Sequence, residues 1–181
     1  MKKVVAIVGM TGSGKSEVAG VFEEHGFKRV RFGDTTDQEL STRGLERNEE
    51  NERYVRQQLR TEHGMAAYAK LNLPRISDAL ESAYVVIDGL YSWEEYLLLK
   101  EHYGDRFSTT AVWAAPSTRY RRLATRRIRP LTHDEAASRD RSEIEVINKG
   151  GPIAMADFTV LNEGSLGDLR RQVEQMISTL R

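Results

Sequence analysis

Short apolar runs, often of β-branched residues, recur along the chain and alternate with segments of helical periodicity. The runs at 4–8, 28–32, 84–87, 109–113 and 158–161 predict strands. The run at 84–87 is nearly all apolar, which is typical of a strand buried on both faces of a parallel sheet. Because strands alternate with helices, we expect an α/β fold with one parallel sheet and right-handed crossovers.

Helix signals fill the intervals between these strands. The stretch 34–71 is rich in charge and helix formers and contains no convincing strand, and Asn48 can cap a helix over 49–63. Pro74 is expected to start a further helix that reaches Ser82. Other helix signals are two capping boxes, Ser92 with Glu95 and Thr132 with Glu135, then Pro116 as a first helical residue and an apolar stripe from Leu166 to Leu180. The helix that starts at the second box is expected to end at 150–152.

Residues 9–16, with the sequence GMTGSGKS, match the phosphate-loop pattern G-x-x-x-x-G-K-[ST] at every specified position. They follow an apolar strand and precede a helix, which is the order this motif requires. In such a loop Lys15 supplies a charge to the β and γ oxygens of a nucleoside triphosphate, and Ser16 offers its hydroxyl to Mg²⁺. The expected nucleotide-binding residues of the loop are Gly9, Thr11, Gly12, Ser13, Gly14, Lys15 and Ser16.

Ligands of an open parallel sheet bind beyond the carboxyl ends of its strands, so the residues at those ends are candidates for chemistry. Asp88 ends an apolar strand, where phosphate-loop enzymes place the carboxylate that orients Mg²⁺ or its water; a cap or turn aspartate is the alternative. Asp34 follows the second strand and can touch an acceptor substrate or a metal-bound water. Capping of the next helix explains Asp34 equally well.

A series of arginines lies between residues 119 and 141, and Arg119, Arg122 and Arg126 fall on one helical stripe. In a kinase such arginines close over the triphosphate and stabilise charge on the transferred phosphoryl group. A solvated face paired with nearby acids is an alternative, and a nucleic-acid-binding stripe ranks lower because aromatic residues are sparse there. The side of this helix expected to be buried consists of Tyr120, Leu123 and Ala124.

Composition limits the classes of function. The 181 residues suit one compact domain, and 27 basic against 27 acidic residues leave no overall field toward nucleic acid or membranes. The absence of cysteine excludes disulfides, thiolate metal sites and cysteine nucleophiles, and the four histidines lack metal-binding spacing. No apolar stretch approaches the ~20 residues of a membrane span, and no signal peptide precedes the first strand. We therefore expect a cytoplasmic protein with no membrane partner and no nucleic-acid partner.

With these residues placed, the chain resembles the nucleoside-monophosphate kinase group of phosphate-loop enzymes. It is most similar to an adenylate-kinase-related family found mainly in archaea, which is itself similar to dephospho-coenzyme A kinases. The motifs that carry the resemblance span essentially the whole chain: GMTGSGKSEVA, FGD, LRTEHGMAAYAK, VVIDG, RDRSE and ADFTVLNEGSL. The resemblance implies that Gly12, Gly14, Lys15 and Ser16 hold ATP and Mg²⁺, that Arg122, Arg126 and Arg139 belong to a lid, and that Asn162 and Gly164 lie beside the adenine.

Two positions depart from the family pattern. The arginine that usually follows the glycine and aspartate of FGD corresponds to Asp37, and the arginine expected shortly after IDG is replaced by Tyr91. Neither a carboxylate nor a phenol can imitate a bidentate guanidinium, and the added charge of Asp37 disfavours a standard monophosphate pose. Arg60 is our candidate for the missing phosphate contact, with Arg43 or Arg56 as further candidates and solvent exposure as the plain alternative.

These observations predict a three-layer α/β/α phosphate-loop fold with a five-stranded parallel sheet, a helical acceptor-binding insert at 34–82 and a short lid at 126–140. The expected function is ATP- and Mg²⁺-dependent phosphoryl transfer to a small acceptor, a nucleotide or nucleotide-like metabolite. The rival functions are a regulatory or RNA-associated ATPase and a non-catalytic nucleotide-binding module. The expected residues are Lys15, Asp88, Arg122, Arg126 and Arg139 in catalysis, Ser16 and Asp88 at the metal, and Asp34 and Arg60 at the acceptor.

Overall fold

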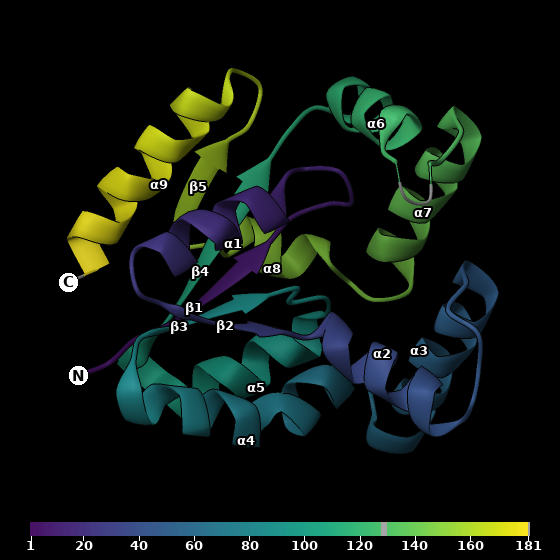
Figure 1. Cartoon of the computed structure of the whole chain (residues 1–181), viewed down its shortest axis with the longest axis horizontal. Helices are drawn as coiled ribbons and strands as arrows, with labels where there is room; N and C mark the ends of the chain where they lie inside the picture. The colour runs from purple at the N-terminus through teal and green to yellow at the C-terminus, as the bar shows by residue number, and fades with distance from the viewer. Residues whose placement is uncertain (128–129, 181) are drawn as a thin grey trace.

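The computed structural model describes residues 1–127 and 130–180, in which the strands are connected through one or more helices (Figure 1). Within those residues no helix is both long enough and apolar enough to cross a membrane. The elements in chain order are β1 (Val4–Val8), α1 (Lys15–Glu24), β2 (Lys28–Arg31), α2 (Gly33–Thr42), α3 (Glu49–His63), α4 (Ala67–Ser82), β3 (Val85–Asp88), α5 (Trp93–Tyr103), a 3-10 turn (Gly104–Arg106), β4 (Phe107–Trp113), α6 (Pro116–Thr125), α7 (His133–Glu145), α8 (Gly150–Ala154), β5 (Phe158–Leu161) and α9 (Leu166–Leu180).

The strands form one parallel sheet with the order β2-β3-β1-β4-β5, as the alternation of elements predicts. Helices α1 and α9 cover one face, and α4 and α5 cover the other (Figure 1). The α/β/α phosphate-loop architecture and the five-stranded sheet are therefore confirmed. Because all strands are parallel, the loops after β1, β2, β3, β4 and β5 meet at one edge of the sheet.

The central strand β1 explains why its sequence is apolar at every position. Val5 and Ile7 pack with Phe22 in the core beneath α1 and α9, whereas Val4 and Ala6 pack in the core beneath α4 and α5. Both faces of β1 are covered, and each of its five residues is 0% exposed. The phosphate-loop motif that follows β1 is thus attached to a strand that cannot move without disturbing both cores.

The segment that follows β2 is helical, as predicted. Asn48 caps α3 by accepting a hydrogen bond from the Asn51 N–H at 2.9 Å. The prediction that Pro74 starts a helix is wrong, because α4 begins at Ala67 and contains Pro74 in its interior. Pro74 lacks an N–H and removes one helical hydrogen bond, and we attribute the continuation of α4 to the burial of its other residues, among them Tyr68 and Ile76.

The end of α7 also differs from the prediction. The helix stops at Glu145, and residues 150–154 form the separate short helix α8. Asn148 lies between them with a φ of 52°, a left-handed conformation that asparagine tolerates and that ends a helix. The N–H of Lys149 then donates to the Glu143 carbonyl at 3.0 Å, so the turn brings Lys149 back toward α7.

The capping box at the start of α5 is confirmed and contains a fully buried carboxyl group. One oxygen of Glu95 accepts hydrogen bonds from the N–H groups of Tyr91 at 2.8 Å and Ser92 at 3.2 Å. Burial outweighs these bonds and raises the pKa of Glu95 from 4.5 to about 7. The ionised form of Glu95 therefore disfavours the folded state.

We expect Glu95→Gln to remove a pH dependence of stability. A carboxyl group with a raised folded-state pKa contributes stability that is complete below its unfolded pKa and is lost as pH rises toward 7, up to about 3 kcal/mol at 1.36 kcal/mol per pKa unit. Glutamine keeps an oxygen for the two N–H groups and cannot ionise. Urea unfolding of both proteins at pH 5 and pH 8 measures the difference, and an identical pH dependence in the two proteins would contradict this account of Glu95.

Candidate functional site

The phosphate-loop motif forms a tight turn between β1 and α1. Gly9 and Gly14 adopt φ values of 148° and 99°. A Cβ atom on Gly9 would lie 2.5 Å from the Val112 carbonyl oxygen, and one on Gly14 would lie 2.1 Å from the side-chain nitrogen of Asn162. Only glycine fits both positions, so the loop is held closely by β4 and by the residues after β5.

Lys15, the first residue of α1, folds back across this loop. Its Nζ atom donates to the carbonyl oxygens of Gly9 at 2.9 Å and Met10 at 3.0 Å. Burial, and then the charge of Lys149, lower the pKa of Lys15 to about 7, and the carboxylates of Glu143 and Asp88 oppose this shift. Ser16 follows at the exposed N-terminal turn of α1, where the helix dipole favours anions.

Two adjoining pockets open beside the loop. The first has a volume of about 350 Å³, and its lining includes Lys15, Ser16, Arg122 and Arg126. The second has a volume of about 380 Å³, and its lining includes Asn162 and Gly164 from the loop after β5. Gly14 and Arg122 line both pockets, so the structure brings the loop, two arginines at the end of α6 and the residues after β5 together at one edge of the sheet.

Asn162 is buried and its side chain is used to hold the loop. Its side-chain Nδ2 atom donates to the Ser13 carbonyl oxygen at 2.8 Å. The backbone carbonyl oxygen of Asn162 accepts a hydrogen bond from Arg122 at 2.9 Å. The other terminal nitrogen of Arg122, Nη1, is buried and has no hydrogen-bond partner among residues 1–127 and 130–180. Arg122 thus carries a donor that an anionic ligand can satisfy.

Arg119 does not belong to the cationic edge predicted for α6. It is 4% exposed, forms two hydrogen bonds of 2.7 and 2.5 Å with Asp140, and donates to the Thr11 carbonyl at 3.1 Å. Ala124, predicted to be buried, is exposed, whereas the burial of Leu123 is as predicted. The helix is turned so that Arg119 ties α6 to α7 and to the phosphate loop.

Glu143 and Lys149 lie next to the loop, although no sequence pattern predicts a role for either of them there. Glu143 accepts hydrogen bonds from the Thr11 N–H at 3.2 Å, the Thr11 hydroxyl at 2.5 Å and Lys149 Nζ at 2.9 Å. Burial alone would raise the pKa of Glu143, but the charges of Lys149 and Lys15 lower it to about 2. Glu143 is part of the RDRSE motif, whereas Lys149 carries no local sequence signal.

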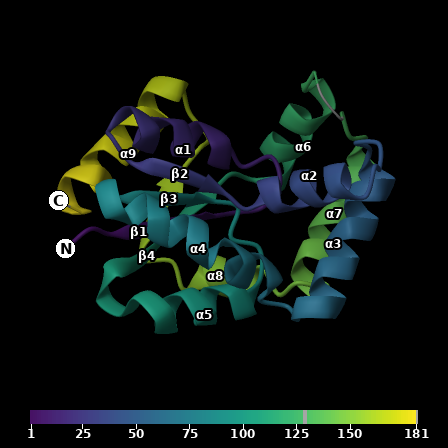
Figure 2. The same ribbon diagram turned by 60° about the horizontal axis from the view of Figure 1, so that its bottom comes forward.

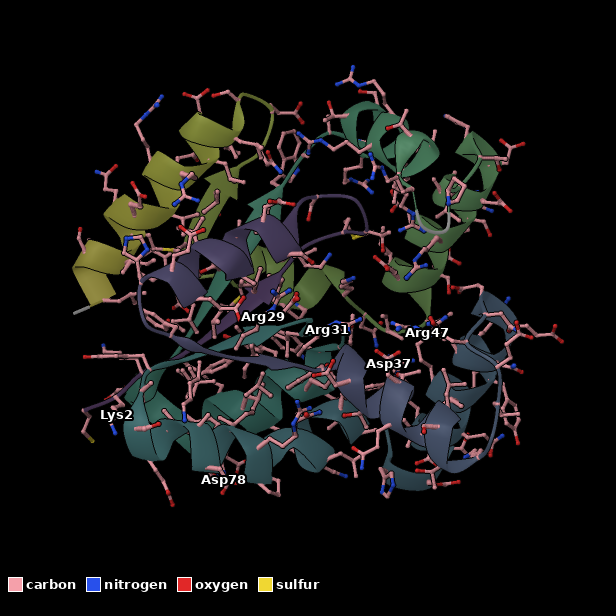
Figure 3. The ribbon with its side chains drawn as sticks, in the orientation of Figure 1. Lys2, Arg29, Arg31, Asp37, Arg47 and Asp78 are labelled. Atoms are coloured by element: carbon pink, nitrogen blue, oxygen red, sulfur yellow. The ribbon has the colours of Figure 1, made fainter. Side chains whose placement is uncertain are left out.

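Asp88 lies at the carboxyl end of β3, is 6% exposed and acts electrostatically on Lys15. One of its oxygens accepts a hydrogen bond from Arg29 of β2 (labelled in Figure 3), and Arg29 also donates to Glu23. No group of three histidine or acidic side chains in the described part of the chain could hold a metal ion by itself. The Ser16 hydroxyl and the Asp88 carboxylate are hard oxygen donors that fit Mg²⁺ when phosphate oxygens supply further ligands.

Asp34 and Asp37, which follow β2, are both paired with arginines. Asp34 forms ion pairs with Arg31 at 3.1 Å and Arg75 at 3.0 Å, and Asp37 forms ion pairs of 3.1 Å with Arg31 and Arg47. Figure 3 shows Arg31, Asp37 and Arg47 gathered where β2 meets α2. Asp37 therefore has two cationic partners, and these reduce the repulsion expected between its charge and an acceptor phosphate.

Arg60 and Tyr91 both contact Tyr68. The Arg60 guanidinium is 5.4 Å from the centre of the Tyr68 ring, and its Nε atom is buried without a hydrogen-bond partner in the described structure. The Tyr68 and Tyr91 rings pack edge to face, with their centres 5.7 Å apart. Burial, together with Asp88 and Tyr68, raises the pKa of Tyr91, so its hydroxyl remains a neutral donor.

Arg139 of α7, expected to belong to a lid, connects its helix to the helical segment after β2. It forms ion pairs with Glu143 at 3.5 Å and with Glu49 of α3 at 3.8 Å. Figure 2 shows α7 and α3 side by side, in agreement with this ion pair. Arg139 consequently faces α3 and Glu143, apart from the first pocket that Arg122 and Arg126 line. Arg129, a further arginine of the series, and Ile128 lie outside the described residues.

Comparisons of the sequence identify its relatives. A family model described as an AAA domain matches residues 5–148. A "UPF0200 protein" of Thermococcus sibiricus is 33% identical, with 98% of this chain and 95% of the relative covered. A "UPF0200 protein" of Thermococcus gammatolerans is 35% identical over the same shares of the two chains.

Comparisons of the structure show the fold. TT1252 from Thermus thermophilus matches with a TM-score of 0.67 at 20% identity, with 99% of this chain and 98% of the other covered. A shikimate kinase from Bacteroides thetaiotaomicron matches with a TM-score of 0.62 at 14% identity over 98% of each chain. A gluconokinase from Sinorhizobium meliloti matches with a TM-score of 0.59 at 16% identity, with 98% of this chain and 93% of the other covered. The chain therefore has the phosphate-loop kinase fold.

Proposed function

The chain belongs to the UPF0200 family and contains an AAA domain, and we propose that it is an ATP-dependent phosphotransferase. Its acceptor is a small molecule, a nucleotide or nucleotide-like metabolite. The observation that carries the proposal is the lining of the first pocket, to which the phosphate loop and α1 contribute Lys15 and Ser16, and α6 and the residue after it contribute Arg122 and Arg126. Three cations around one pocket beside a phosphate loop suit a triphosphate whose terminal group is transferred.

The residues divide the work of binding ATP. The loop and Lys15 hold the β- and γ-phosphates, and the second pocket, bounded by Asn162 and Gly164, takes the base. Asn162 serves the base indirectly, since its side-chain nitrogen holds the Ser13 carbonyl. The buried Nη1 atom of Arg122 gains a phosphate partner when the nucleotide is present.

Charge neutralisation and positioning are what the protein supplies to the transfer. Ser16 and Asp88 would hold Mg²⁺, and Arg29 orients the Asp88 carboxylate. Such an ion would supply neutralisation of phosphate charge when bound. Arg126 approaches the transferred group from the lid. Arg139 binds Glu143 and Glu49 and so sets the position of α7 against α3.

The acceptor side lies across the loop, between β3 and the helices after β2. Arg60 lies next to Tyr68, and Tyr68 packs against Tyr91, directly beyond the carboxyl end of β3. Asp34 is held in place by Arg31 and Arg75 and can contact the acceptor from the end of β2. A phosphate or another anionic group of the acceptor fits the buried, unpartnered Nε donor of Arg60.

The proposal is tested with Mg-ATP and a panel of ribo- and deoxynucleoside monophosphates, AMP among them, plus dephospho-coenzyme A. ADP and phosphorylated product are followed together. Formation of product with one acceptor class supports the proposal. ADP release at the same rate with no acceptor present would support a regulatory or RNA-associated ATPase instead.

Arg60→Ala is expected to raise the KM for the acceptor by about tenfold or more, because a hydrogen bond to a charged group is worth about 1.5–3 kcal/mol. The KM for ATP is expected to stay unchanged, since Arg60 does not line either nucleotide pocket. Steady-state kinetics measure both constants. The matched control is Arg53→Ala on the exposed side of the same helix, and equal acceptor KM values in the two variants would remove Arg60 from the acceptor site.

A further inference from the structure

Lys149 is a lysine that the fold buries almost completely. It precedes α8, follows the left-handed residue Asn148, and is 1% exposed. Lysine is rarely buried without a charged partner, because removing an ammonium ion from water is costly. Such a residue at the edge of the sheet where ligands bind requires an account of what it does there.

The partners of Lys149 place it between the phosphate loop and the acceptor side. Its Nζ atom donates to Glu143 at 2.9 Å, and the same carboxylate binds the N–H and hydroxyl of Thr11 in the loop. The Nζ atom is also 5.4 Å from the centre of the Tyr91 ring, beyond the carboxyl end of β3. Lys149 is near enough to Lys15 for the two positive charges to act on each other.

The carboxylates around these two lysines are shared with other cations. Glu143 is also bound by Arg139 at 3.5 Å, and Asp88 is bound by Arg29. Each carboxylate charge is thus divided between a lysine and an arginine. An additional anion between Lys15 and Lys149 would relieve the repulsion of the two ammonium groups. A Lys149 ammonium has three N–H donors, so it can bind such an anion and keep its bond to Glu143.

We propose that Lys149 is a second phosphate-binding lysine of this site, whose ammonium group binds a phosphoryl group placed between the phosphate loop and Tyr91. This inference rests on the proposed function and names one more residue of its site. The bound group is either the transferred phosphoryl group or a phosphate of the acceptor itself. Both present the same tetrahedral set of anionic oxygens.

The competing account is that Lys149 only neutralises Glu143. The two accounts are separated by the double variant Lys149→Met/Glu143→Gln, in which both charges disappear together. Replacing both partners of a buried ion pair by neutral groups of similar shape is tolerated far better than removing one of them. The single variant Glu143→Gln keeps the lysine and is the matched control. Thermal unfolding checks that the unaltered protein, the double variant and Glu143→Gln are all folded.

The probe is inorganic phosphate, whose binding is followed by phosphorus NMR in the presence of saturating Mg-ADP or a saturating Mg²⁺ complex of a non-hydrolysable ATP analogue. We expect the double variant to bind phosphate at least about tenfold more weakly than Glu143→Gln, since it lacks a charge-assisted hydrogen bond. Its affinity for Mg-ADP is expected to match that of the control. If the double variant binds phosphate more weakly only in the Mg-ADP complex, Lys149 binds the transferred group. If phosphate binding is weaker in both the Mg-ADP complex and the ATP-analogue complex, Lys149 binds the acceptor's phosphate.

Two results overturn the inference alone. Either the unaltered protein does not bind phosphate in either complex, or the double variant binds it as tightly as Glu143→Gln does. In both cases Lys149 is a structural partner of Glu143. Failure of the unaltered protein to bind Mg-ADP is a different result, because it overturns the proposed function and the inference with it.

Discussion

Replacement of Lys15 by alanine is expected to abolish phosphoryl transfer and leave the fold intact. The Lys15 ammonium contacts the Gly9 and Met10 carbonyl oxygens of its own loop. Alanine at this position leaves the loop without that positive charge. Loss of a donor that stabilises transition-state charge costs on the order of 10²–10³ in turnover or more. The measurement is kcat for ADP formation, together with calorimetric titration of Mg-ATP and thermal unfolding.

A matched control for Lys15→Ala is Lys100→Ala, which removes an exposed lysine on α5, away from the carboxyl edge of the sheet. That variant is expected to behave as the unaltered protein does. Equal ATP affinity and equal turnover in Lys15→Ala would mean that residues 9–16 do not hold the reacting phosphates.

Arg126→Ala is expected to slow phosphoryl transfer by a factor on the order of 10²–10³ with little change in the affinity for ATP. Arg126 lines the same pocket as Lys15, where a cation is most useful when negative charge shifts onto the transferred group. Single-turnover kinetics and equilibrium titration separate the two effects.

The control for this variant is Arg121→Ala, which removes an exposed arginine from α6, the helix that Arg126 follows directly. If Arg126→Ala instead lowers stability while the rate per folded molecule stays unchanged, Arg126 has a structural role. Arg119, whose guanidinium is buried against Asp140, has such a role.

The fold could be predicted from local patterns because each strand carries its own signal. Val4–Val8 is apolar throughout since β1 is covered on both faces, and the capping boxes at Ser92 and Thr132 fix the helix starts. The prediction for Pro74 is wrong because proline favours a helix start only as a local preference. The packing of the residues around Pro74 outweighs this preference in α4.

The parts of the candidate site that lie in one continuous motif could be predicted from the sequence. The parts that depend on contacts between distant segments could not. The phosphate loop is one continuous motif, so its glycines and Lys15 are read directly. Arg119 has the helical spacing of Arg122, and only its contact with Asp140, 21 residues further on, makes it structural. Lys149 reaches the loop through the turn at Asn148, and no periodicity marks such a residue.

The acceptor side shows the same dependence on distant contacts. The sequence places Asp37 where an arginine is expected, which indicates repulsion of a phosphate. The structure pairs Asp37 with Arg31 and Arg47, from β2 and from the loop before α3. AMP and other monophosphates therefore belong in the acceptor panel on equal terms with dephospho-coenzyme A.

The most direct test of phosphoryl transfer is a time course of ADP and phosphorylated product with Mg-ATP and the acceptor panel, run for the unaltered protein and for Lys15→Ala. The proposed function predicts that ADP and one phosphorylated acceptor accumulate in equal amounts in the unaltered protein, and that neither accumulates in the variant. ADP that accumulates at the same rate without any acceptor, with no phosphorylated product from the panel, would contradict it.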